Sequence, residues 1–101
     1  MLAEFSIVPL DKGVSLSEYV SKVIDIVDTS DLDYKLTPMG TVVEGDWDEV
    51  MDLISECHGE MRKYSDRIET KIIIDDRKGA NNRLTGKINS VEKRLGKEVN
   101  K

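Results

Sequence analysis

The sequence predicts an α+β fold of the ferredoxin-like class: a four-stranded antiparallel sheet with helices on one face, followed by an extra C-terminal helix. Four segments alternate in polarity, and two longer segments repeat apolar residues every three or four positions. Their order along the chain is β-α-β-β-α-β, the ferredoxin-like order, and a further amphipathic segment follows. A chain of 101 residues has the length of one domain, so we expect residues 1–101 to form a single domain.

The first strand is expected over residues 2–9, followed by a turn and a helix. This strand has one apolar and one mixed face, formed by Ala3, Phe5 and Ile7 and by Glu4, Ser6 and Val8. The helix is expected to begin at Ser15, because Ser15 and Glu18 have the spacing of a capping box. Its apolar stripe has helical spacing and comprises Leu16, Tyr19, Val20, Val23, Ile24 and Val27.

A hairpin or bulge and a second helix are expected next. Residues 33–37 and 41–44 alternate in polarity on either side of Pro38 and Gly40. Proline cannot donate to a strand ladder and glycine accepts unusual backbone angles, so the chain is expected to turn or bulge here. Asp46 and Glu49 form a second cap-like pair before a helix that ends near Tyr64. Its expected buried stripe is Trp47, Val50, Met51, Ile54, Cys57 or His58, and Met61.

The fourth strand is expected over residues 67–74 and the last helix up to Gly96. The last helix is marked by an apolar stripe of Leu84, Ile88, Val91 and Leu95. We expect the second face of the sheet to be half polar, with Val8, Val43 and Ile73 among its apolar residues. Such a face is unfavourable in a monomer, which indicates a homo-oligomer.

The composition excludes several classes of function. Fifteen basic and 20 acidic residues give a net charge of -5, which argues against broad binding to nucleic acid or to an anionic membrane surface. No apolar run approaches the ~20 residues that span a bilayer. The first residues lack a basic region, so we expect no signal peptide. One cysteine, Cys57, excludes an intramolecular disulfide and fits a reducing cytoplasm.

The charge is unevenly distributed. Residues 1–76 carry a net charge of -11 and residues 77–101 carry +6. One interpretation is that the last helix docks on an acidic surface of its own or a neighbouring subunit. A second is a phosphate-binding regulatory arm built around Arg77, Lys78, Arg83 and Lys87. Nucleic acid is a weaker alternative, because only one segment is basic.

Two residue pairs could carry chemistry, but neither predicts an enzyme or a metal centre. Neighbouring residues of a helix, such as Cys57 and His58, point about 100° apart, and the chain has no second cysteine or histidine to complete a zinc site. Asp75 and Asp76 are neighbours at a strand end and point to opposite faces. We expect them to form a turn and a salt bridge to Arg77. No cofactor is expected.

The segment P-M-G-T-V-V-E-G at 38–45 is the most distinctive of the chain. Together with F-S-I-V-P-L at 5–10, S-L-S at 15–17, E-V at 49–50, C-H at 57–58 and I-D-D-R-K-G at 74–79, it resembles the small YkoF-like thiamine-binding family. The resemblance spans nearly the whole chain. It implies a ferredoxin-like domain that assembles into dimers and commonly tetramers, and that binds thiamine or its hydroxymethylpyrimidine fragment without catalysis.

If the ligand is thiamine, its chemistry selects candidate residues around the hairpin. The thiazolium is a permanent cation, which suits the carboxylate of Glu44 and the polarizable Met39. The aminopyrimidine needs donors and acceptors, which Thr37, Thr41 or Ser6 could supply. Each also has a structural alternative, such as packing for Met39 and a solvated hairpin charge for Glu44.

Two further candidates lie outside the hairpin. Ser15 is expected at a helix N-terminus, where backbone N–H groups could meet a hydroxyl or phosphate, although it could equally be a simple cap. Arg77 is a candidate for an anionic group. The competing functions are a structural protein whose hairpin only builds the oligomer, and an enzyme that uses Asp75, His58 or a metal.

Overall fold

The predicted fold class is confirmed by a computed structural model, which describes residues 1–14, 16–79 and 83–100, apart from the side chain of Lys87. Four strands and three helices follow one another in the predicted order. The elements are β1 (Leu2–Pro9), α1 (Ser17–Thr29), β2 (Asp33–Thr37), β3 (Gly40–Glu44), α2 (Trp47–Arg62), β4 (Ile68–Asp75) and α3 (Arg83–Leu95). In the described ranges, no helix is long and apolar enough to cross a membrane.

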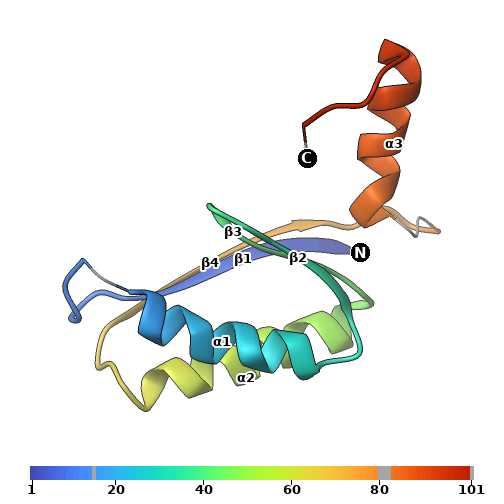
Figure 1. Ribbon diagram of the computed structural model, residues 1–101. Helices are drawn as coiled ribbons and strands as arrows, with labels where there is room; N and C mark the ends of the chain where they lie inside the picture. The colour runs from blue at the N-terminus through green and yellow to red at the C-terminus, as the bar shows by residue number, and fades with distance from the viewer. Residues whose placement is uncertain (15, 80–82, 101) are drawn as a thin grey trace.

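The strands form one antiparallel sheet in the order β2-β3-β1-β4. Helices α1 and α2 cover one face of this sheet, and α3 stands on the opposite side, at one end (Figure 1). Strand β1 pairs with β4 along all of Leu2–Pro9 but with β3 only along Leu2–Phe5. The outer half of β1 therefore has a neighbour on one edge only.

The core lies between the sheet and the α1–α2 layer. The alternate residues of β1 from Ala3 to Pro9 are buried there, and the other four are partly exposed on the open face. The remaining buried hydrophobic residues come from α1, β3 and α2: Val23, Val27, Val43, Val50, Leu53, Ile54, Cys57 and Met61.

Two expectations about burial are wrong. Val43 is fully buried on the helix-covered face, because it pairs with Ala3; its neighbour Val42 lies on the open face instead. Trp47 is 54% exposed at the start of α2, and Leu53 occupies the core from this helix. A first-turn residue lies at the end of the helix, where the amphipathic pattern alone does not settle packing.

The helix ends show which local signals act as predicted. Asp46 and Glu49 form the expected capping box at α2, with the Asp46 carboxylate accepting the N–H of Glu49 at 2.8 Å. Gly96 ends α3 with a φ of 70°, a left-handed conformation that favours glycine. Helix α1 differs from the prediction, because Leu16 is its N-cap and makes no side-chain cap hydrogen bond. Ser15 lies outside the described residues.

A hydrogen-bonded junction joins the loop after β1 to the loop before β4. The Asp11 carboxylate accepts hydrogen bonds from the Ser65 hydroxyl and from the N–H of Asp66. These bonds favour the ionised form and hold the pKa of Asp11 below its usual value of 3.8. The junction fixes the end of the sheet at which the outer half of β1 lies.

Candidate functional site

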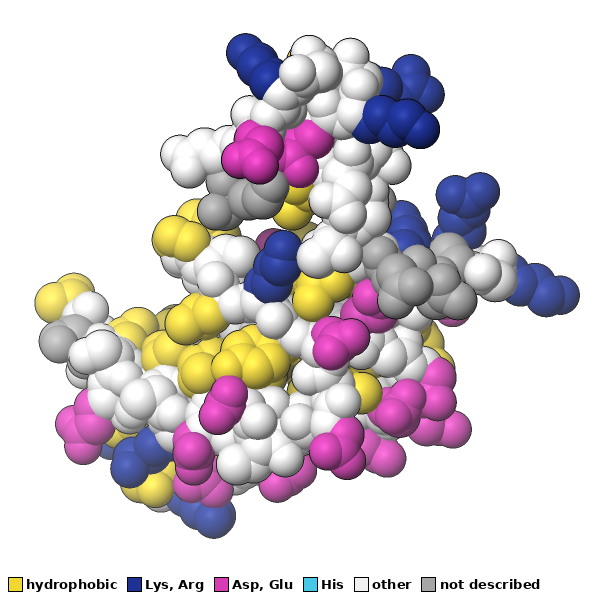
Figure 2. Space-filling view, turned by 45° about the vertical axis from the view of Figure 1, so that its right-hand side comes forward, with side chains coloured by type: hydrophobic (Ala, Val, Ile, Leu, Met, Phe, Trp, Pro, Cys, Tyr) yellow, Lys and Arg dark blue, Asp and Glu magenta, His cyan; other side chains and the backbone are white. Residues whose placement is uncertain are grey.

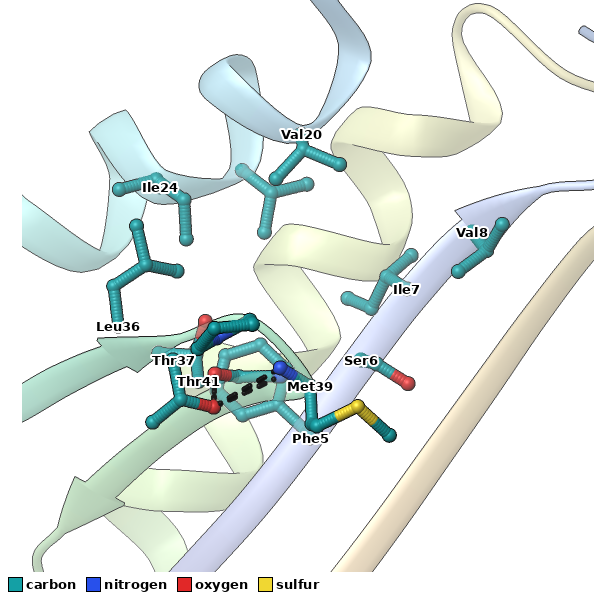
Figure 3. A pocket seen from close by; sticks show the side chains of 13 residues that line it. Phe5, Ser6, Ile7, Val8, Val20, Ile24, Leu36, Thr37, Met39 and Thr41 are labelled. Atoms are coloured by element: carbon teal, nitrogen blue, oxygen red, sulfur yellow. Dashed lines mark hydrogen bonds between the residues drawn. The ribbon is translucent and has the colours of Figure 1, made fainter. Parts of the chain in front are cut away.

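A pocket of about 190 Å³ lies where the β2–β3 hairpin stops and β1 continues. Its floor is the outer half of β1, and α1 closes it from above. Figure 3 shows Val20 and Ile24 reaching from α1 toward the hairpin, with Leu36 reaching toward them from β2. The other lining residues are Phe5, Ser6, Ile7, Val8, Val23, Thr37, Pro38, Met39, Gly40 and Thr41.

The hairpin turn that bounds the pocket is held by Thr37. Its hydroxyl donates to the carbonyl oxygen of Gly40 at 2.8 Å and accepts the N–H groups of Met39 and Gly40, each at 3.2 Å (Figure 3). A hydroxyl has one donor and two acceptor sites, so all of them are used. Gly40 is required because a Cβ there would lie 2.9 Å from the carbonyl oxygen of Phe5. The hairpin therefore approaches β1 as closely as backbone permits.

Four of the predicted site residues meet at this pocket: Ser6, Thr37, Met39 and Thr41. They differ in how far their side chains are exposed and free to contact a ligand. Thr41 is 4% exposed on the helix-covered face, and within the described chain its hydroxyl has no hydrogen-bond partner. Ser6 belongs to the half of β1 that faces away from the helices. Met39 is 83% exposed at the tip of the turn and also borders a second hollow on the open face.

The pocket lining carries no charged side chain. Val20, Ile24 and Leu36 supply apolar walls, and the Thr41 hydroxyl is a free donor and acceptor in them. An apolar cleft with few polar groups favours a flat, uncharged ring over an ion, because burying an unpaired charge is costly.

Glu44 lies at the far end of β3 and does not line this pocket. Its carboxylate accepts the backbone N–H groups of Arg83, at 2.8 Å, and Leu84, at 3.2 Å, at the start of α3. Arg83 also forms an ion pair with Asp75 at the end of β4. The hydrogen bond to Asp75 raises the pKa of Arg83 above its ordinary value. Glu44 therefore holds the first turn of α3.

The basic residues of 77–101 do not act together: Arg83 is engaged by Asp75, whereas Arg77 and Lys78 are exposed. The salt bridge of Asp75 is formed with Arg83, so the expected pair with Arg77 is wrong. Arg77 and Lys78 are exposed after β4 and do not reach the pocket. Figure 2 shows acidic side chains along the α1–α2 layer and basic ones around α3. Because α3 stands on the opposite side of the sheet, it does not dock on the acidic helices of its own chain (Figure 1).

Cys57 and His58 have structural rather than chemical roles. Cys57 is fully buried, and burial raises the pKa of its thiol to about 12. A thiol with this pKa is protonated at neutral pH and is a poor nucleophile. His58 Nδ1 lies 2.7 Å from the Thr70 hydroxyl, which ties α2 to β4. Among the residues that the structure describes, no three metal-ligating side chains are grouped together.

This chain matches one known protein family over most of its length. The model of the family described as "Thiamine-binding protein" matches residues 3–92. The chain belongs to the thiamine-binding protein family. The family relationship confirms the resemblance inferred from the hairpin segment.

Other members of the thiamine-binding protein family share most of this chain. The UPF0045 protein MJ1052 of Methanocaldococcus jannaschii is 38% identical over 91 residues, which is 90% of this chain and 91% of that protein. A UPF0045 protein of Methanothermobacter thermautotrophicus is 33% identical over 96 residues, 92% of this chain and 97% of its own length.

Solved structures agree with the fold. The crystal structure of MJ1052 matches with a TM-score of 0.83 and 39% identity, covering 89% of this chain and 93% of that one. A Thermotoga maritima protein named for thiamine biosynthesis or salvage matches with a TM-score of 0.79, covering 89% of this chain and 96% of its own. Its identity is 22%, so this likeness concerns the fold alone.

Sequence reasoning missed the apolar wall of the pocket. Val20 and Ile24 were expected only as core residues of α1, and Leu36 only as one face of a strand. The signal that could have found them is the unequal strand length: eight residues in β1 against five in β3. Unequal partners leave part of the longer strand beside open space.

Proposed function

We propose that the protein binds thiamine, or a related molecule with a pyrimidine or thiazole ring, in the pocket between α1 and the β2–β3 hairpin, without catalysing a reaction on it. The observation that carries this proposal is an uncharged, largely apolar pocket, bounded by the distinctive hairpin, in a member of the thiamine-binding protein family.

The size of the pocket supports partial enclosure of such a ligand. Sites for drug-sized molecules measure about 300–1,000 Å³, whereas this pocket has about 190 Å³. One ring with its substituents fits this space, and a second ring would extend past Met39. The thiazolium cation would then remain in solvent, which suits a pocket without a carboxylate.

The protein is proposed to act as a homo-oligomer, with a tetramer built from two dimers as the expected form. On the open face of the sheet Ile73 is 66% exposed, and hollows lie on either side of it. The apolar stripe of α3 is also uncovered, with Val91 49% and Leu95 54% exposed. Exposed apolar side chains on one side of the molecule indicate a contact surface, and a second copy of the chain would cover them. The reducing cytoplasm remains the expected compartment, on the basis of the single buried cysteine.

The test is calorimetric titration of thiamine into protein that was unfolded and refolded to remove carried ligand. Wild-type protein is expected to show saturable binding. Thr41→Val, which removes the free hydroxyl and preserves the side-chain shape, is expected to weaken binding about ten-fold through loss of one hydrogen bond. Glu44→Gln is the matched control, because Glu44 lies outside the pocket, and its affinity is expected to equal that of the wild type.

Light scattering on the same samples tests the assembly. Ile73→Lys is expected to lower the molar mass, whereas Trp47→Lys, on the helical layer, is expected to leave it unchanged. Absence of thiamine binding by folded, oligomeric protein would overturn the ligand assignment and favour a structural role in assembly. A single-chain molar mass for the wild type would overturn the oligomer.

A further inference from the structure

We propose that β4 pairs with β4 of a second copy of this chain, antiparallel and centred on Thr70, so that the two four-stranded sheets become continuous. This inference rests on the proposed homo-oligomer and specifies one of its contacts. A tetramer built from two dimers needs two different contact surfaces. The open face of the sheet supplies one of them, and the edge of β4 supplies the other.

Strand β4 forms an outer edge of the sheet, beside β1 (Figure 1). It pairs with β1 along all eight of its residues, and among the described residues no strand pairs with its other side. Eight residues at about 3.4 Å each make an edge of roughly 27 Å. The opposite edge strand, β2, has only five residues. A long, regular edge with neither proline nor bulge is a template for pairing with another chain.

Alternate residues of β4 direct their backbone groups to this outer side. Leu10 donates its N–H to the carbonyl oxygen of Arg67 at 2.8 Å, so Arg67 faces β1. Successive residues of a strand direct their N–H and C=O groups to opposite sides, and the regular pairing with β1 continues this alternation along β4. The outward-facing residues are therefore the even-numbered ones, Ile68, Thr70, Ile72 and Ile74. A second β4 satisfies them in a register that aligns even-numbered with even-numbered residues.

Charge selects among these registers. Pairing about a two-fold axis at Thr70 places Glu69 of each copy opposite Lys71 of the other. An axis at Lys71 would place the two lysines opposite each other, and an axis at Ile72 would place Glu69 opposite Asp75. Like charges directly opposite destabilise a strand pair, whereas opposite charges stabilise it. The register centred on Thr70 is therefore favoured over both.

The other registers are disfavoured for different reasons. An axis at Ile73 would pair Lys71 with Asp75, whose carboxylate is already held by Arg83. Axes nearer either end would leave most of β4 unpaired. An axis at Thr70 instead extends an exposed ion pair, because Glu69 and Lys71 lie 3.4 Å apart with side chains 48% and 71% exposed. The glutamates and lysines of the two copies would then alternate in sign around the axis.

The helix-covered side of the edge agrees with the same register. Ile68 of each copy would lie opposite Ile72 of the other, and Ile72 is 37% exposed in the single chain. At the axis, the Thr70 hydroxyl lies 2.7 Å from Nδ1 of His58, so the middle of the edge is fixed to α2 before a second copy binds. An edge that is already ordered loses little conformational entropy on pairing.

Disulfide capture tests the register. Two residues that face each other at the axis have Cα atoms about 5.5 Å apart in a hydrogen-bonded antiparallel pair, a separation that a disulfide can bridge. Mild oxidation of Thr70→Cys at micromolar concentration is therefore expected to link most chains into dimers. Ile72→Cys is the matched control on the same strand and face. Its two copies would be about 14 Å apart along the strand, so it is expected to link at least about ten-fold more slowly.

Wild-type protein is a second control, because its one thiol, Cys57, is buried and is expected not to link. Equal rates for the two variants, or faster linkage of Ile72→Cys, would refute the register. Absence of linkage in folded Thr70→Cys whose molar mass shows an oligomer would overturn the edge contact and leave the proposed oligomer intact. A single-chain molar mass for the wild type would overturn both.

Two charge reversals test the same contact without changing the backbone of the edge. Glu69→Lys places lysines opposite Lys71, and Lys71→Glu places glutamates opposite Glu69. Each variant alone is expected to raise the dissociation constant of the contact at least about ten-fold in sedimentation experiments, because two attractive pairs become repulsive. An equimolar mixture of the two is expected to recover assembly, since every opposite pair between unlike chains is attractive. Asp25→Lys, an exposed reversal on α1, is the control and is expected to assemble as the wild type does.

The mixture distinguishes a contact between copies from an effect within one chain. Within each variant, positions 69 and 71 carry like charges, and mixing does not change this. Two variants that dissociate alone and do not recover when mixed would show that the charges act within the chain, which would refute the register. Unchanged assembly of both single variants would refute the contact itself.

Discussion

Glu44 is predicted to anchor α3 rather than to bind the ligand. Its two carboxylate oxygens accept the N–H groups of Arg83 and Leu84, which are among the groups that a helix N-terminus leaves without intrahelical partners. Loss of a side chain that satisfies such a group costs about 0.5–2 kcal/mol. Loss of a negative charge at the helix N-terminus costs about 0.3–1 kcal/mol.

Together these effects predict that Glu44→Ala destabilises the docked α3 by roughly 1–2 kcal/mol, which increases its opening about 5- to 30-fold. The effect is expected to be local, because α3 packs mainly on β2 and β3 and stands apart from the core. Glu44→Gln retains one acceptor oxygen and loses the charge, so its effect is expected to be intermediate.

Hydrogen exchange followed by mass spectrometry measures this opening. Peptides within 83–95 are expected to exchange 5- to 30-fold faster in Glu44→Ala than in wild type at the same protein concentration, while peptides within 47–62 keep their rates. Glu69→Ala is the control, since Glu69 is an exposed strand carboxylate that pairs with Lys71 and not with α3 in the described part of the chain. Unchanged exchange in α3 would refute the anchoring role, and equal acceleration in both helices would refute its local character.

Three further predictions concern stability and reactivity. Because folding lowers the pKa of Asp11, the ionised carboxylate stabilises the folded protein above the ordinary pKa of 3.8, and this stabilisation is lost as the pH falls through the folded-state pKa. The difference in melting temperature between wild type and Asp11→Asn is therefore expected to shrink between pH 5 and pH 2. A difference that stays constant over this range would contradict the prediction. Leu53→Ala is expected to lower the free energy of unfolding by about 2–5 kcal/mol, measured with denaturant, because Leu53 is buried. Trp47→Ala at an exposed position is expected to change it by about 0.5 kcal/mol or less. Similar losses for the two variants would show that Trp47 packs in the core. The Cys57 thiol has a pKa of about 12, so it is expected to resist a thiol-specific disulfide reagent at pH 8 in the native protein. It is expected to react fully in denaturant. Rapid labelling of the native protein would show that the thiol is accessible.

The elements of this protein were predictable because their signals are local. Alternation over residues 2–9 identified β1, and the Asp46–Glu49 pair identified the start of α2, since both patterns act within a few residues of the chain. The error at Trp47 arose at a helix end, where local periodicity carries least information. The register error at Val43 arose because the pairing partner of a short strand is set by a distant segment.

The sequence by itself determined the fold class, the family resemblance and the hairpin that borders the pocket. Only the tertiary structure decided that Ser6, Thr37, Met39 and Thr41 meet at one pocket and that Glu44 is engaged by α3. It also decided that the pairing of β1 with β3 ends at Phe5, whereas its pairing with β4 continues to Pro9. The physical reason is that the pocket results from a mismatch in length between β1 and β3, and this mismatch becomes a cavity only when residues far apart in the chain are paired in register and roofed by α1.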